Sequence, residues 1–137
     1  MNWVVDAINL LRLRKEKRMK KKIYFGLDPD FKKMSGLIVA VAQDYQTKEV
    51  LMQAFMNRQA WEKTLESKKA WFWSRSRKKL WLKGNTSGNI MKVKEIRLDC
   101  DCDCVLLSVE VCGDKVACHT GSRSCFSLPL NFEGEMT

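Results

Sequence analysis

The sequence predicts an α+β domain with a mostly antiparallel sheet and one main helix. Short apolar segments separated by turn residues indicate about seven strands, and one segment with a polar N-cap and helical spacing interrupts them. Strands joined by short turns and accompanied by few helices are typical of α+β folds. The chain has 137 residues, of which 45% are hydrophobic and 30% charged, which suits a single globular domain.

We divide the chain into a basic leader and linker (residues 1–33), a folded domain (34–130) and a C-terminal tail (131–137). The first 22 residues contain eight Lys and Arg and two acidic residues, a net charge of +6 against +9 for the whole chain. A solvated helix explains this segment, and contact with nucleic acid or an anionic membrane is the alternative. Asp6 and Asn9 break its short apolar part, which excludes a signal peptide or membrane span. We therefore expect a cytoplasmic protein without a membrane partner.

The folded domain begins with two predicted strands and the helix. Residues 37–44 are apolar and rich in Val and Ile, and a polar turn separates them from a second apolar segment at residues 49–56. Asn57 is a favourable N-cap for a helix over residues 58–67. Within it, Trp61 and a leucine four residues later share one side and are predicted to face the core.

The remaining predicted strands surround a basic turn and end in a hairpin. They comprise residues 70–74, 80–83, 90–98, 105–111 and 116–119. The last two strands are predicted to pair across the turn at residues 112–115. Trp71, Trp73 and Trp81 have strand spacing, and we expect them to be core side chains rather than stacking platforms for nucleic-acid bases.

Acids and thiols alternate from Asp99 to Cys104. In an extended chain Asp99, Asp101 and Asp103 would share one face and the three cysteines the other. Three neighbouring carboxylates repel one another unless a cation lies among them. Oxygen ligands suit Mg²⁺, Ca²⁺ or Mn²⁺, whereas thiolates suit Zn²⁺. The alternative is a solvated acidic turn beside ordinary buried cysteines.

A second thiol element contains Cys118 and Cys125. Six residues separate the two, which is longer than the usual spacing of a structural zinc knuckle. Together with Cys100 they would provide three ligands and leave one position open, as in catalytic zinc sites. His119, the single histidine, follows Cys118 directly and is suited to proton transfer near neutral pH. All six cysteines lie in the last 38 residues, which favours metal binding or catalysis in a reducing compartment over a disulfide scaffold.

These two motifs resemble those of the phosphoribosyl-AMP cyclohydrolase family. The similarity includes the runs 73–77 and 83–84 and covers roughly residues 34–127. It implies a hydrolase that acts on a cyclic amidine C–N bond. The reaction would open the adenine ring of N1-(5-phosphoribosyl)-AMP between N1 and C6 by a zinc-activated water, the third step of histidine biosynthesis. The resemblance also implies an intertwined homodimer that needs Zn²⁺ and Mg²⁺.

The resemblance assigns a role to each candidate residue. Cys100 of one subunit would join Cys118 and Cys125 of the other around zinc, and His119 would transfer a proton. The three carboxylates would hold magnesium, namely Asp99, Asp101 and Asp103. The two substrate phosphates would lie on the basic segment, through Arg75, Arg77 and Lys83.

Two other interpretations remain open. Residues 1–30 and the Trp/Arg segment would also suit a non-catalytic zinc-binding module that binds nucleic acid, although the open zinc position makes nucleic acid the weaker choice of partner. Asn85 and Val111 depart from the family pattern, which raises an inactive or repurposed homologue as an alternative. Two further departures are the additional thiols Cys102 and Cys104 and a loop over residues 113–117 that is two residues longer.

Overall fold

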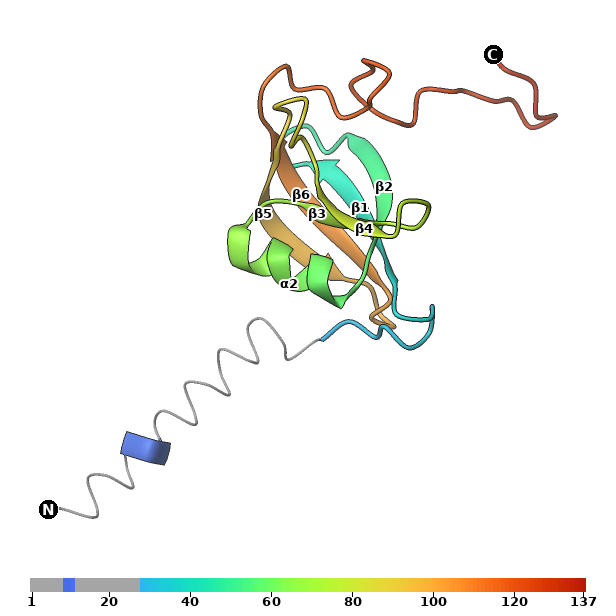
Figure 1. The fold of residues 1–137 in the computed structure, drawn as a ribbon. Helices are drawn as coiled ribbons and strands as arrows, with labels where there is room; N and C mark the ends of the chain where they lie inside the picture. Colours follow the sequence, from blue (N-terminus) through green and yellow to red (C-terminus); the bar gives the residue numbers. More distant parts are fainter. Residues whose placement is uncertain (1–8, 12–27) are drawn as a thin grey trace, which may run out of the picture.

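The computed structural model describes residues 9–11 and 28–137, and it confirms the α+β prediction. Six strands form one curled sheet, and a helix packs against one side of it (Figure 1). The elements are β1 (Ile38–Asp44), β2 (Val50–Met56), α2 (Arg58–Ser67), β3 (Trp71–Ser74), β4 (Lys79–Leu82), β5 (Met91–Leu98) and β6 (Cys104–Val111). The strand order is β4-β3-β2-β1-β6-β5, and β1 with β6 is the one parallel pair among these strands.

The core lies between the sheet and α2. Alternate residues of β1 and β6, such as Ile38 and Leu107, are fully buried, as the two-residue period of a strand requires. The helix contributes Trp61, which is 2% exposed, and packs against β2, β3 and β4. Its predicted bounds and N-cap are confirmed, because the Asn57 side chain accepts a hydrogen bond from the amide of Ala60 at 2.9 Å.

Residues 116–119 do not form the predicted strand, so the sheet has six strands instead of about seven. The reason is that β6 already pairs with β5 on one edge and with β1 on the other, which leaves no edge free. After β6 the chain turns at Cys112, whose amide donates to the carbonyl of Ile90 at 2.8 Å. It then crosses to the start of β2, where the amide of Cys125 donates to Leu51 at 2.7 Å.

The alternating acids and thiols form the turn between β5 and β6, so the expected extended conformation is wrong. Leu98 pairs with Val105 and Cys104 begins β6, which leaves residues 99–103 to reverse the chain. A carboxylate oxygen of Asp99 accepts the amides of Asp103 and Cys104, both at 3.1 Å, in the way that Asp side chains stabilise turns. The thiols therefore do not share one face opposite the acids.

The two ends of the chain are only partly described. The basic leader and most of the linker predicted for residues 1–33 lie outside the described residues, except for a helical turn at residues 9–11. The described part of the linker begins at Asp28, whose carboxylate forms a 2.9 Å ion pair with Arg58 at the start of α2. The C-terminal tail extends away from the sheet with Phe132 exposed (Figure 1). Within these described parts, no helix has the length and apolar character needed to cross a membrane.

Candidate active site

The predicted metal ligands occupy opposite ends of the sheet. Cys100 and the three acids lie in the turn that precedes β6, whereas Cys118 and Cys125 lie beyond the end of β6 (Figure 1). The eight residues of β6 span about 23 Å at the usual rise of a strand. One chain therefore does not bring Cys100 to the other two thiols. Within residues 9–11 and 28–137, a single group of three ligating side chains comes together, formed by Asp99, Asp101 and Asp103.

These three residues form the acid triad, and each offers a carboxylate oxygen within 4.8 Å of the others. Lys33 lies beside them, with its Nζ 3.3 Å from a carboxylate oxygen of Asp101 and 3.9 Å from one of Asp103. Hydrogen bonds with Asp99, Asp103 and Lys33 lower the pKa of Asp101. Desolvation and the neighbouring carboxyls raise the pKa of Asp103. Three carboxylates facing one ammonium group leave excess negative charge, so this oxygen donor set fits a hard divalent cation.

The thiol pair is the second potential metal-binding group. The Cys118 sulfur is 3.0 Å from the hydroxyl of Thr120, and Cys125 lies near enough for the two thiols to shift each other's pKa. Hydrogen bonding by Thr120 lowers the pKa of Cys118, whereas partial desolvation raises the pKa of Cys125. Two adjacent thiols fit a soft metal such as Zn²⁺, with further ligands required from elsewhere.

The additional thiols at positions 102 and 104 do not extend either group. Cys102 lies in the β5–β6 turn and Cys104 is the first residue of β6, and both are half-buried, whereas Cys100 is exposed. Desolvation, together with the nearby carboxylates, raises the pKa of Cys104, which keeps that sulfur in its protonated form. No group of three metal-ligating side chains in the described part of the chain includes any of these cysteines.

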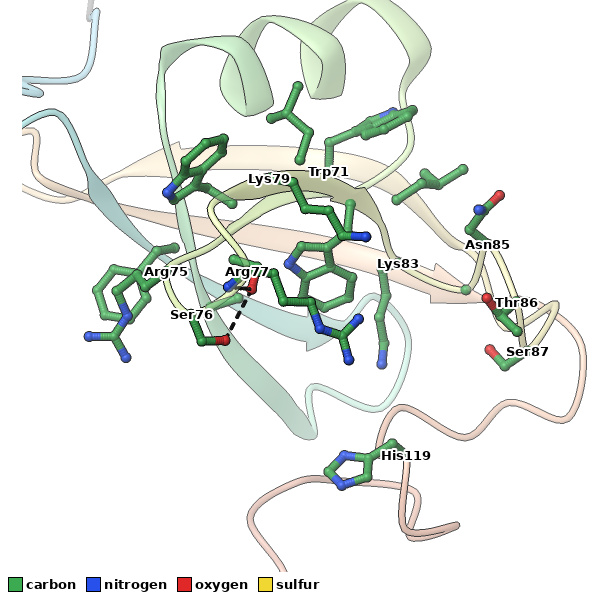
Figure 2. A pocket seen from close by; sticks show the side chains of 18 of the residues that line it. Trp71, Arg75, Ser76, Arg77, Lys79, Lys83, Asn85, Thr86, Ser87 and His119 are labelled. Atoms are coloured by element: carbon green, nitrogen blue, oxygen red, sulfur yellow. Dashed lines mark hydrogen bonds between the residues drawn. The ribbon is translucent and has the colours of Figure 1, made fainter.

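A pocket of about 900 Å³ opens beside β3, β4 and the loop that follows them (Figure 2). Its wall includes all four predicted substrate-binding and catalytic residues, which are Arg75, Arg77, Lys83 and His119. Figure 2 shows Arg77 and Lys83 extending toward the segment that carries His119. The Lys83 ammonium group also donates a hydrogen bond to the carbonyl of Ala117, so it links the pocket to the thiol pair.

Arg75 differs from the other basic residues of the pocket. Its guanidinium carbon lies 3.9 Å from the ring centre of Phe55, a cation–π contact that directs the side chain onto β2. In Figure 2 it points away from Arg77, Lys83 and His119. The structure therefore brings Arg77 and Lys83 toward His119 and separates Arg75 from them.

The three tryptophans have a double role. Trp71, Trp73 and Trp81 are each half-buried, and all three line the pocket, whereas Phe72 between them is fully buried in the core. The expectation of core side chains thus holds in part for Trp71 and Trp81, which pack against the core, but not for Trp73. Sequence reasoning assigned no role to the pocket hydroxyls of Ser76, Thr86 and Ser87. Their short polar side chains in a loop carried no signal of their own.

Glycine is required where this loop returns to the sheet. Gly84 has φ +85°, and a side-chain carbon there would lie 2.3 Å from the backbone of Asn89. This close approach forms the rim of the pocket that carries Thr86 and Ser87. The glycine in the Lys83-Gly84 run therefore has a steric reason that the sequence alone did not reveal.

Arg123 was missed as well, although it lies between Cys118 and Cys125. Its guanidinium group donates to Asp44 at 2.7 Å, to Glu49 at 2.8 Å and to the carbonyl of Lys115 at 2.7 Å. These partners lie at the end of β1, at the start of β2 and in the turn after β6. Arg123 is separated from Glu49 by 74 positions and from Asp44 by 79, and contacts over such separations leave no local pattern in the sequence.

Comparison with known proteins places this site in a family. The family model for phosphoribosyl-AMP cyclohydrolase matches residues 52–127. A phosphoribosyl-AMP cyclohydrolase of Desulfatibacillum aliphaticivorans is 61% identical over 100 residues, which cover 73% of this chain and 79% of that protein. The enzymes of the same name from Methanosarcina mazei and Clostridium botulinum are 60% and 57% identical, over 74% of this chain and 82% and 90% of theirs. The chain thus belongs to the phosphoribosyl-AMP cyclohydrolase family of hydrolases.

Proposed function

We propose that the protein hydrolyses the N1–C6 bond of N1-(5-phosphoribosyl)-AMP, the third step of histidine biosynthesis. The observation that carries this proposal is the position of His119. It lies on the wall of the same pocket as Arg77 and Lys83, and it is adjacent in sequence to Cys118. Membership of the family supports the same reaction.

The pocket offers complementary groups to the parts of this substrate. Its phosphates would lie against Arg77 and Lys83, with hydrogen bonds from Thr86 and Ser87 at the rim. The half-buried ring of Trp81 offers an apolar surface to the purine. A pocket of about 900 Å³ lies within the range that encloses small-molecule ligands.

The reaction adds one water across the N1–C6 bond. Zinc, when bound by thiolates, would supply Lewis acidity that activates a water molecule. His119 accepts the proton of that water while its oxygen bonds to C6. The C6–N1 bond then breaks, N1 receives the proton, and C6 becomes the carbon of a carboxamide. Because His119 is exposed on the pocket wall, it can exchange protons with solvent between turnovers.

We further propose that the site is shared by two copies of the chain. One copy would provide the pocket, His119 and the thiol pair. The other would provide Cys100 and the adjacent acid triad for Mg²⁺, because both lie at the far end of its own sheet. An antiparallel arrangement of two sheets brings opposite ends together. This homodimer supplies the third thiol that one chain does not bring to Cys118 and Cys125.

Turnover with metal removal tests the reaction. Purified protein is incubated with N1-(5-phosphoribosyl)-AMP, and loss of the purine absorbance is followed with and without a zinc chelator. We expect turnover that the chelator abolishes and added Zn²⁺ restores. Absence of turnover in the zinc-loaded protein would overturn the proposed activity, and turnover indifferent to zinc removal would overturn the metal assignment.

Mixing of two inactive variants tests the shared site. Cys100→Ser and Cys118→Ser are each expected to be inactive alone, because every site loses one ligand. After the two chains are mixed and allowed to exchange subunits, half of the sites in a mixed dimer contain all three thiols. We expect activity and zinc binding to return in the mixture. A mixture as inactive as its components would contradict sharing between subunits, provided that one variant is labelled with ¹⁵N and exchange is verified by mass.

A further inference from the structure

Arg123 occupies the centre of the segment that holds the thiol pair. Its three donor groups contact the carboxylates of Asp44 and Glu49 and the carbonyl of Lys115, at 2.7 to 2.8 Å. Its own carbonyl accepts the amide of Ala117 at 3.0 Å. Arg123 therefore joins the two segments of the thiol-bearing loop, around Ala117 and around Arg123 itself, to the end of β1 and the start of β2.

The main partner of Arg123 is itself held rigidly. One oxygen of the Asp44 carboxylate accepts the amides of Gln46 and Thr47, at 2.9 and 2.8 Å, and only the other oxygen meets Arg123. The Asp44 side chain is 13% exposed. Because the β1–β2 turn already fixes the Asp44 carboxylate, forming the ion pair costs conformational freedom only in the Arg123 side chain.

The neighbours of Arg123 extend this attachment toward the sulfurs. The Ser124 hydroxyl donates to the carbonyl of Val50 at 2.7 Å, and the amide of Cys125 donates to Leu51 at 2.7 Å. On the other side of the loop, the amide of Cys118 donates to the carbonyl of Ser122 at 3.1 Å. Cys118 is thus attached to the sheet through the segment that Arg123 holds and through Ala117, which is buried in the core and accepts the Lys83 contact.

We propose that Arg123 is the positioning residue that holds Cys118 and Cys125 together before any metal binds. The inference rests on the proposed function, because the thiol pair is its zinc-binding half. Arg123 touches neither the substrate pocket nor a sulfur, so it acts through the loop. A guanidinium meets this task because one planar group donates in three directions at once. A lysine ammonium in its place would reach one carboxylate and lose the contacts with the second carboxylate and the carbonyl.

A metal-free measurement of the thiol pair tests the proposal. A short bifunctional thiol reagent is applied to the full chain, and the Cys118–Cys125 cross-link is quantified by mass spectrometry against single alkylation of Cys118 by a monofunctional reagent. We expect Arg123→Met to lower the ratio by at least about fivefold, since it lowers the effective concentration of one thiol near the other. The ratio for Arg123→Lys should lie between those of the wild type and Arg123→Met. An unchanged ratio would overturn the proposal.

The control is Arg97→Met on β5. Arg97 is also an arginine of an ion pair, but its side chain is 74% exposed and its partner Glu95 is 3.9 Å away. We expect its cross-linking ratio to equal that of the wild type. Should Arg123→Met fail to fold by circular dichroism, Glu49→Ala replaces it, because that change removes the acceptor of the Arg123 Nε and leaves Asp44. A Glu49→Ala chain with the wild-type ratio would then overturn the proposal.

Zinc affinity and kinetics separate this inference from the proposed function. By competition with a chelator, Arg123→Met should bind zinc about tenfold or more weakly, as loss of groups that orient metal ligands does elsewhere. Its kcat should fall while KM stays within twofold, because the pocket lies on β3 and β4. A wild-type chain that binds no zinc would overturn the zinc site, and the cross-linking ratio alone would then decide the role of Arg123.

Discussion

The two ends of the sheet carry candidate metal-binding groups that are built in different ways. At one end, the acid triad arises within a single turn, and Asp99 caps residues only four and five positions later. At the other end, the loop of the thiol pair is held by the contacts of Arg123 with Glu49 and Asp44, which lie 74 and 79 positions earlier in the sequence. The acid end is exposed and its charges repel one another, and backbone hydrogen bonds such as that from the amide of Val39 to the carbonyl of Asp103 join it to β1. The thiol end is joined to β1 and β2 through the charged side chains of Asp44, Glu49 and Arg123.

This difference suits the two kinds of metal that we propose for the chain. A hard cation tolerates a flexible cluster of oxygen ligands, because it accepts variable coordination and retains water. A thiolate site with an open position requires ligands held in a fixed geometry. The thiol end is stabilised by two long-range ion pairs of Arg123, whereas the acid end combines hydrogen bonds within its own turn with the ion pair from Lys33.

The largest expected effect is at the thiol end. His119→Ala should lower turnover by at least ~100-fold, the usual contribution of a general acid–base group. The fold should be unchanged, since His119 is exposed. Steady-state kinetics measure the loss, and added imidazole should restore part of the rate. Near-normal turnover without imidazole would remove His119 from proton transfer.

Substitution at the acid end should affect one metal only. Asp101→Asn should weaken binding of Mn²⁺, used as a spectroscopic probe for Mg²⁺, by at least ~10-fold because a carboxylate ligand is lost. Zinc affinity should remain unchanged. Titration with each metal provides the measurement, and Glu95→Gln, an exposed acid on β5, is the control. Equal loss of both metals would show that the two ends are not independent.

Acid should destabilise the thiol end through Asp44. Hydrogen bonds from Thr47, Gln46 and Arg123 hold the pKa of Asp44 below its ordinary value. A carboxyl whose pKa is lower in the folded state stabilises the fold above the unfolded pKa, and this contribution disappears as the pH falls through the folded pKa. Asp44→Asn should therefore lower the free energy of unfolding by about 1 kcal/mol at pH 7.

The same variant should cost progressively less stability below about pH 4, where the carboxyl of the unfolded wild-type chain becomes protonated, and the difference should vanish below the lower pKa of folded Asp44. Urea unfolding at pH 7 and at lower pH values measures this convergence. A constant difference at all pH values would show that Asp44 acts without its charge.

The smallest effect is expected in the acid turn. Cys102 has φ +62°, a left-handed conformation that a side chain disfavours and glycine adopts freely. Cys102→Gly should raise the free energy of unfolding by less than ~1 kcal/mol, since the relief is partly offset by the greater freedom of glycine in the unfolded chain. Thermal unfolding of the metal-free protein checks the sign. A lower midpoint would indicate that the thiol has stabilising contacts.

Local patterns predicted much of the fold correctly. The bounds of α2 and the cap at Asn57 were correct because an N-cap and a helical period are properties of adjacent residues. The failures share a different cause. The predicted strand at residues 116–119 has suitable residues but no free edge, since β1 and β5 already flank β6. Sheet order is a long-range property that no segment encodes by itself.

The sequence alone determined which side chains are available for chemistry: the thiols, the acids, His119 and the basic residues of the β3–β4 segment. Residue types and their spacing suffice for this, because ligand chemistry depends on atoms rather than on the fold. Only the tertiary structure decided which of these groups meet. It placed Cys100 and the thiol pair at opposite ends of one sheet, brought Lys83 to the carbonyl before Cys118, and made Arg123 the link between loop and strands. Distances across a sheet follow from strand pairing and direction, which the chain acquires only when it folds.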